Sequence, residues 1–284
     1  MWRWLEQVLR WLNRVLRWLN QVLRWLNRLL RRPQPIPDAL WQRTLGHYPF
    51  LTALCQADQH KLRLLSAQFL ARKQFSGTHN LVVTDDMAVA IAAQACLPVL
   101  HLAKGEGLAW YDDFEGIVVH PGAMLAQRSE TDAAGVVHYY REPLIGEAMQ
   151  GGPVTLSWAD VAESGQSADR GHNVVIHEFV HKIDMRTGSA NGCPPLPSRA
   201  AREHWQATMQ AAFDAFKEQV VMAERFGAEQ PWLDAYGATA PAEFFAVAAE
   251  GYFVNRKRFE LEFLALAQLF DSFFYAGKNY KRLA

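Results

Sequence analysis

The pentapeptide His177-Glu-Phe-Val-His181 restricts the fold more than any other feature of the sequence, because its spacing is functional only on a helix. Side chains at positions i and i+4 of an α-helix lie on one face about one turn apart, so both imidazoles can reach a single metal ion. The preceding Asn173-Val-Val-Ile segment is largely apolar, which favours a buried helix over a loop. The sequence therefore predicts a buried helix that carries a pair of metal ligands.

This pattern is typical of metal-assisted hydrolysis. Zinc held by two imidazoles at about 2.0–2.1 Å polarises a carbonyl and lowers the pKa of a water molecule. Glu178 follows the first histidine directly, so its carboxylate can take a proton from the attacking water and later pass it to the departing amine. We expect one Zn²⁺ per chain, although the same donors accept other divalent ions. The alternative is two core histidines, which would need other partners for both buried rings.

A third protein ligand must come from outside the motif, since catalytic zinc sites normally have three. An extended motif with Gly and His at positions 184 and 187 is excluded, because Asp184 and Thr187 stand there. We therefore expect an acidic ligand on a later helix. Glu243 is favoured because it follows Pro241 at the start of an apolar helix, and Glu250, seven residues later on the same face, is the alternative. The other candidates are Glu203, His204, Asp214, Glu218, Glu224 and Asp234.

Composition limits the class of protein. A chain of 284 residues, 50% of them hydrophobic, can bury a core in one large domain or two modest ones. Basic and acidic residues number 29 each, so the net charge is zero and does not favour direct binding to nucleic acid. The three cysteines have no CxxC spacing, which indicates neither a disulfide framework nor a cysteine zinc site. We expect a cytoplasmic protein.

The first 32 residues differ from the rest, because they hold eight arginines and a single acid. A seven-residue unit, Val-Leu-Arg-Trp-Leu-Asn followed by Arg or Gln, repeats from residue 8 onward and predicts a basic amphipathic helix. Frequent arginines exclude a signal peptide or a transmembrane helix. Residues 33–38, Pro-Gln-Pro-Ile-Pro-Asp, predict a stiff linker. The expected organisation is an arm at 1–32, a linker at 33–38 and a domain at 39–284.

Three interpretations of the arm remain open. Its tryptophans and leucines can enter the interface of an anionic membrane while the arginines meet phosphates, which would make the protein peripheral to the membrane. The same apolar stripe can drive self-association in a helical bundle. The arm can also dock on its own domain.

The body has the pattern of an α+β fold, with helices, then a small sheet, then helices. Asp58 is the expected N-cap of the first long helix. The expected helices cover 58–74, 85–96, 171–185, 199–226, 241–254 and 258–275, and the expected strands 116–120, 136–140 and 154–158.

Two segments carry a resemblance to a known family. Gly171-His-Asn-Val-Val-Ile, continuing through the pentapeptide to Asp184, and Tyr236-Gly-Ala-Thr-Ala-Pro-Ala-Glu-Phe-Phe-Ala resemble the Mlc titration factor A family of zinc metallopeptidases, which is related to the lethal-factor catalytic domain. Segments 96–100, 110–114 and 165–167 extend the resemblance to about residues 38–275, outside the arm. It implies a zincin-like metallopeptidase domain with helices around a small sheet, preceded here by the amphipathic N-terminal helix.

The resemblance also implies roles for individual residues. His177, His181 and Glu243 fall on the zinc ligands, and Glu178 falls on the general base. Tyr236 falls on a tyrosine that points into the site, where a phenol could stabilise an oxyanion. Asp184 belongs to the family pattern and could accept a hydrogen bond that orients a metal ligand.

The family's biology gives two further expectations. Its members are cytoplasmic, show aminopeptidase-like activity on short peptides, and bind the repressor Mlc, which affects expression of the sugar phosphotransferase system. The resemblance thus implies a peptide substrate and Mlc as partners. The alternative function is a non-catalytic regulator that sequesters a transcriptional repressor.

Overall fold

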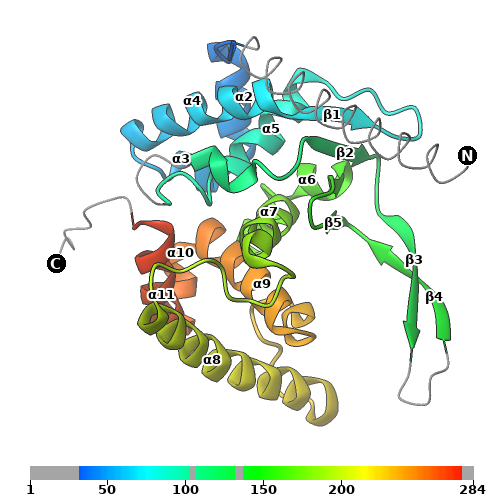
Figure 1. Ribbon diagram of the computed structural model, residues 1–284, viewed down its shortest axis with the longest axis vertical. Coiled ribbons are helices and arrows are strands. Elements are labelled where there is room, and N and C mark those ends of the chain that lie inside the picture. The colour runs from blue at the N-terminus through cyan, green and yellow to red at the C-terminus, as the bar shows by residue number, and fades with distance from the viewer. Residues whose placement is uncertain (1–31, 103–106, 132–136, 277–284) are drawn as a thin grey trace, which may run out of the picture.

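The computed structural model describes residues 32–102, 107–131 and 137–276 (Figure 1). The helix predicted for residues 1–32 lies outside these ranges, apart from Arg32. Within them the chain forms an α+β fold, which confirms the predicted class, with one difference. The first strand follows α4 directly, so the first helices and the sheet are interleaved along the chain.

The main sheet has four strands. Its order is β1-β2-β6-β5, with β1, β2 and β6 parallel and β5 antiparallel to β6 at the edge. The strands are Gln74–Gly77 (β1), Gly116–His120 (β2), Gly146–Ala148 (β5) and Val154–Ser157 (β6). β2 and β6 were predicted because they are apolar. β1 and β5 were missed, since they have only four and three residues and little hydrophobic alternation.

A separate antiparallel ribbon projects from the body (Figure 1). It consists of β3, Met124–Thr131, and β4, Val137–Leu144. The strand predicted at 136–140 corresponds to the first half of β4. Because only one residue separates β4 from β5, the ribbon leads directly into the edge of the main sheet.

The helices that precede α7 in the chain lie on the sheet side of the molecule in Figure 1. They are Asp38–His47 (α2), Pro49–Thr52 (α3), Gln56–Arg72 (α4), Asp85–Cys96 (α5) and Trp158–Glu163 (α6). The prediction of Asp58 as an N-cap was wrong, because α4 begins two residues earlier and Cys55 occupies the cap. Asp58 instead lies in the first turn, where a carboxylate interacts well with the helix dipole, 3.0 Å from His101 Nε2.

The remaining helices are the central helix α7 and those on the other side of the molecule. They are Val174–Asp184 (α7), Arg199–Phe226 (α8), Pro241–Val254 (α9), Arg256–Glu262 (α10) and Leu264–Phe274 (α11). The single helix predicted for 258–275 is two, because Phe263 leaves the helical conformation with φ −132° and ψ 51°. That break lets α11 direct Phe270 and Phe274 into an aromatic cluster with Phe245.

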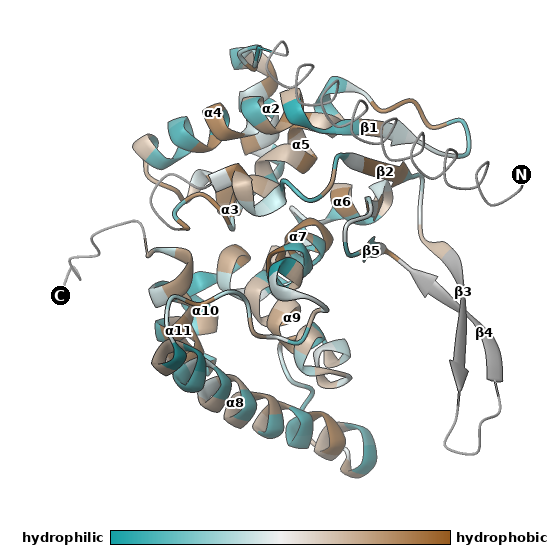
Figure 2. Ribbon diagram, viewed as in Figure 1, coloured by the Kyte–Doolittle hydropathy of each residue, from teal (hydrophilic) through white to brown (hydrophobic). Residues whose placement is uncertain are grey.

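The central helix is α7, which lies between the sheet side and helices α8–α11 (Figure 1). Ten of its eleven residues are buried, and it packs against α5, α9 and β5. Hydrophobic residues concentrate on α5, α9 and β2 in Figure 2, whereas α8 alternates between polar and apolar positions. Among the described helices, none combines the length and hydropathy needed to cross a membrane.

Candidate active site

The helix predicted for the His-Glu-x-x-His pentapeptide is α7, and its start is fixed by side chains. Asn173 caps it, accepting a hydrogen bond at Oδ1 from Ile176 N over 2.9 Å. The Asn173 side chain also donates to Gln94 Oε1 on α5 over 2.7 Å. Phe179 and Ile183 on one face enter the core. The opposite face presents both histidines of the motif to a cavity.

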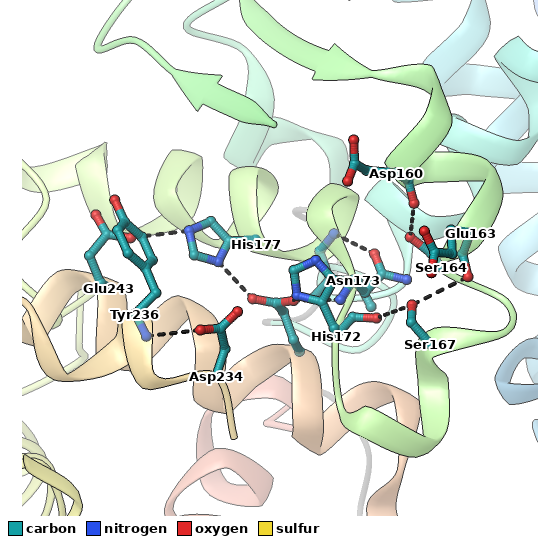
Figure 3. A network of polar contacts seen from close by, with 12 residues as sticks. Asp160, Glu163, Ser164, Ser167, His172, Asn173, His177, Asp234, Tyr236 and Glu243 are labelled. Carbon is teal, nitrogen blue, oxygen red and sulfur yellow. Dashed lines mark hydrogen bonds and ion pairs between the residues drawn. The ribbon is translucent and has the colours of Figure 1, made fainter. Parts of the chain in front are cut away.

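Side chains from α7 and α9 converge at one point of this cavity. The Nε2 atoms of His177 and His181 lie 3.1 Å apart, and each lies 3.1 Å from Glu243 Oε2. Figure 3 shows Glu243 reaching across to His177. Donors about 2.0–2.1 Å from a tetrahedral ion are about 3.3 Å from one another, so this cluster fits one zinc ion in both donor type and spacing. These three residues could hold a metal.

The electrostatics of the cluster keep Glu243 in its charged form. Burial opposes ionisation of Glu243, but hydrogen bonds from His177 and His181 outweigh it and hold the pKa of this carboxyl well below its usual value. Burial likewise lowers the pKa of His177, yet Glu243 and Glu250 outweigh that effect and raise it well above its ordinary value. The carboxylate is therefore available in its charged form as a metal ligand.

Glu178 lies next to the cluster and is almost completely buried, with 5% of its surface exposed. Burial raises the pKa of Glu178 to about 7, although the two neighbouring histidines lower it. Its carboxylate packs against the backbone of Gly146 on β5, where a Cβ atom would come within 2.7 Å of Glu178 Cγ and closer still to Oε1. The absence of a side chain at position 146 thus makes room for this carboxylate.

The cavity has a volume of about 440 Å³ and two different walls. One wall is β5 with the preceding Ile145, and the other comes from α9 and the 3₁₀ turn Ala235–Ala238. That turn carries Tyr236, whose ring centroid lies 6.3 Å from that of His177 (Figure 3). Asp234 holds the turn by accepting a hydrogen bond from Tyr236 N over 2.9 Å. The structure therefore places Tyr236 on the cavity beside the histidine cluster.

Glu250, the alternative third ligand, lies on the other side of His177. It is 1% exposed, and its Oε1 accepts a hydrogen bond from His177 Nδ1 over 2.7 Å. Its Oε2 accepts one from Asn173 N and lies 3.1 Å from His172 Nδ1. Of the two glutamates, only Glu243 reaches the Nε2 atoms. The seven-residue spacing on α9 indicated that Glu250 lies near the cluster, but this contact with His177 Nδ1 was not predicted.

The other candidate ligands are distributed elsewhere. Asp234 lines the cavity but caps the turn that carries Tyr236. Five candidates are exposed on α8: Glu203, His204, Asp214, Glu218 and Glu224.

Asp184 is completely buried at the end of α7. Its Oδ2 accepts hydrogen bonds from the backbone N–H groups of Asn191, over 2.8 Å, and Gly192, over 2.7 Å. A Cβ atom at Gly192, where φ is +79°, would lie 2.6 Å from the carbonyl oxygen of Pro241. Asp184 thus holds a loop against the start of α9, close to Glu243. Its predicted hydrogen-bonding role toward a metal ligand stays a prediction.

The chain is similar to proteins of a known family. A family model described as glucose-regulated metallo-peptidase M90 matches residues 22–275. The chain is 34% identical over 235 residues to Mlc titration factor A of Klebsiella pneumoniae subsp. pneumoniae strain ATCC 700721 / MGH 78578, covering 82% of this chain and 84% of that protein. Identity and coverage are the same for Mlc titration factor A of Escherichia coli strain K12 / DH10B.

The family match confirms the resemblance and extends it. It begins at residue 22, so it includes the proline-rich linker and the last part of the arm, whereas the resemblance begins at about residue 38. The family model covers the pentapeptide helix and the helix that carries Glu243. The chain belongs to the glucose-regulated metallopeptidase M90 family.

Proposed function

We propose that this protein is a zinc-dependent peptidase with aminopeptidase-like activity on short peptides. The observation that carries the proposal is the convergence of His177, His181 and Glu243 at 3.1 Å separations beside the buried Glu178. These three side chains would hold one Zn²⁺. When bound, the ion would polarise the scissile carbonyl and acidify the attacking water.

Glu178 is the proposed general base. A carboxylate whose pKa is about 7 can take a proton from water near neutral pH and return it to the departing amine, since proton transfer is most efficient when the catalytic pKa is close to the working pH. Burial against Gly146 keeps this carboxylate fixed beside the cluster of His177, His181 and Glu243. Tyr236 faces the same space and would donate its phenolic hydrogen to the oxyanion.

The edge strand β5 is the proposed binding site for the substrate backbone. Ile145 O accepts from Ser157 N over 2.8 Å, and Met149 N donates to Pro153 O over 3.3 Å. In an antiparallel ladder the intervening alternate residues turn their backbone groups away from the partner strand, which here means Gly146 and Ala148. Both line the cavity, so an extended peptide could add to this edge with its scissile carbonyl next to the proposed metal ligands.

The relatives' name supports a second function, contact with the repressor Mlc. We propose that this chain binds such a repressor, and that it acts in the cytoplasm. Residues 1–32 are proposed to contact an anionic membrane surface or a second copy of the chain. If binding to Mlc survives both metal chelation and loss of Glu178, this function is independent of catalysis and the non-catalytic alternative gains support.

Substitution Glu178→Gln tests the catalytic proposal. The amide keeps the shape of the side chain but cannot take a proton, so we expect kcat for a short chromogenic peptide to fall by about 10²- to 10⁴-fold. Zinc content measured by mass spectrometry should stay at the wild-type level. Activity of the wild-type chain should disappear on chelation and return with added zinc. A zinc-loaded Glu178→Gln variant with full peptidase activity would contradict the proposed role.

A further inference from the structure

The buried carboxylate of Glu250 lies at Nδ1 of the His177 ring, whereas Glu243 lies at Nε2. Three nitrogen atoms lie close to its two oxygens. His177 Nδ1 donates to Oε1, whereas Asn173 N donates to Oε2, which also lies 3.1 Å from His172 Nδ1. Only 1% of Glu250 is exposed, so water does not substitute for these contacts.

One helix therefore holds both nitrogens of the His177 ring. Glu243 and Glu250 are seven residues apart on α9, which is close to two full turns and places them on one face. Glu243 Oε2 lies 3.1 Å from Nε2, and Glu250 Oε1 lies 2.7 Å from Nδ1. The ring is thus clamped between two carboxylates of the same helix.

We infer that Glu250 is a positioning residue that fixes the tautomer and the orientation of His177 for the metal. A neutral imidazole carries its proton on one nitrogen, and a carboxylate at Nδ1 keeps it there. The lone pair of Nε2 then points toward His181 and Glu243. A carboxylate at the far nitrogen also makes the imidazole a stronger ligand. This inference rests on the proposed function, because it assumes that the cluster binds zinc.

The contact with Asn173 gives Glu250 a second positioning effect. Asn173 is the N-cap of α7, so the bond from its backbone N–H connects the start of the ligand helix to α9. A negative charge at a helix N-terminus is favourable because of the helix dipole. The same carboxylate thus sets the position of α7 and the rotation of the His177 ring.

The substitution Glu250→Gln replaces the carboxylate with its closest neutral analogue. The glutamine oxygen can accept a hydrogen bond from His177 Nδ1 only if the glutamine NH₂ group faces the backbone N–H of Asn173. Both of these groups are donors, so the second hydrogen bond is lost. We expect zinc affinity, measured on the full chain by competition with a chromophoric chelator, to fall by about 10- to 100-fold. The visible spectrum of the cobalt(II)-substituted chain should change as well. Glu163→Gln removes the same charge from an exposed side chain paired with Arg170, and should keep wild-type affinity and spectrum.

Wild-type zinc affinity and an unchanged cobalt spectrum in Glu250→Gln would overturn the inference. If that variant does not fold, nitrogen NMR of histidine-labelled, zinc-loaded wild-type chain decides instead. Protonation of His177 at Nδ1 is expected, and protonation at Nε2 would overturn the inference. Failure of the wild-type chain to bind zinc would overturn the proposed function together with this inference, whereas equal binding by wild type and Glu250→Gln would overturn this inference alone.

Discussion

The two walls of the cavity contribute different parts of the chain. The strand wall, β5, contributes backbone groups to the cavity. At Gly146 the absence of a side chain leaves room for the Glu178 carboxylate. The helix wall offers functional groups, among them Tyr236 and Glu243. A side chain can be replaced by a near-isostere that lacks one atom, but a backbone edge can be altered only by blocking it. We therefore expect activity to fall when a substitution removes a functional group from the helix wall. On the strand wall we expect it to fall when a substitution adds a group.

Helix α7 connects the two walls. Glu250 joins its start to the helix wall, as described above. On the other side Lys182, which is fully buried, donates to Met149 O over 2.9 Å and forms an ion pair with Asp113 over 2.9 Å. Met149 directly follows β5. The ligand helix is thus attached by one buried charge to each wall, which keeps the cluster and the strand edge in register.

On the helix wall, Tyr236→Phe removes a single hydroxyl. If that hydroxyl stabilises the oxyanion, kcat should fall by about 10²- to 10³-fold, as is typical for loss of one such donor. The KM and the zinc content should change little, because the ring stays beside His177. Steady-state kinetics with a short peptide and metal analysis provide the test. A wild-type kcat in the variant would show that the Tyr236 hydroxyl takes no part in the reaction.

On the strand wall, Gly146→Ala adds a single methyl group. Because it would collide with the Glu178 carboxylate, the proposed general base must shift, and we expect about a 10²-fold loss of kcat/KM. Gly46→Ala is the matched control, since a Cβ there meets nothing within 4 Å and lies on α2. It should leave peptidase activity unchanged. Equal activity of the two variants would show that the strand wall does not depend on the absence of a side chain.

The smallest effect concerns stability on the sheet side of the molecule, where Tyr48, between α2 and α3, is buried and its hydroxyl donates to Val161 O over 3.1 Å. Burial raises the pKa of Tyr48 from 10.0 to about 12, although a hydrogen bond with Gln94 lowers it. Between pH 10 and 12 the unfolded chain loses this proton while the folded chain keeps it. The free energy of unfolding should therefore fall as pH rises through this window, by about 3 kcal/mol for this group.

Chemical denaturation at a series of alkaline pH values measures this effect. In Tyr48→Phe the decrease should be smaller, but not abolished, because burial also raises the pKa of Tyr111 and of Tyr252, which lies behind the helix wall. The variant should be less stable at neutral pH by about 1 kcal/mol, since Val161 O loses its hydrogen bond. An identical pH dependence in wild type and Tyr48→Phe would exclude this contribution.

The same difference between the walls explains what sequence alone could predict. Helices α9 and α7 were predictable, because hydrophobic periodicity, the Pro241 start signal and the His-Glu-x-x-His spacing are local patterns, and α9 has the predicted bounds. The strand wall was not, since β5 has three residues and becomes a strand only by pairing with β6. The role of Glu250 also depends on tertiary contacts, because its partners lie more than 70 residues away in the sequence.

The most direct test of the account is the metal content of the full chain compared with its Glu243→Gln variant, measured by mass spectrometry together with peptide cleavage before and after chelation. We expect about one zinc per wild-type chain and chelator-sensitive cleavage that zinc restores. The variant should bind zinc much more weakly and lose activity, because the oxygen that lies 3.1 Å from both histidine nitrogens is no longer a carboxylate. A wild-type chain without metal, or a variant with full zinc content and full activity, would contradict it.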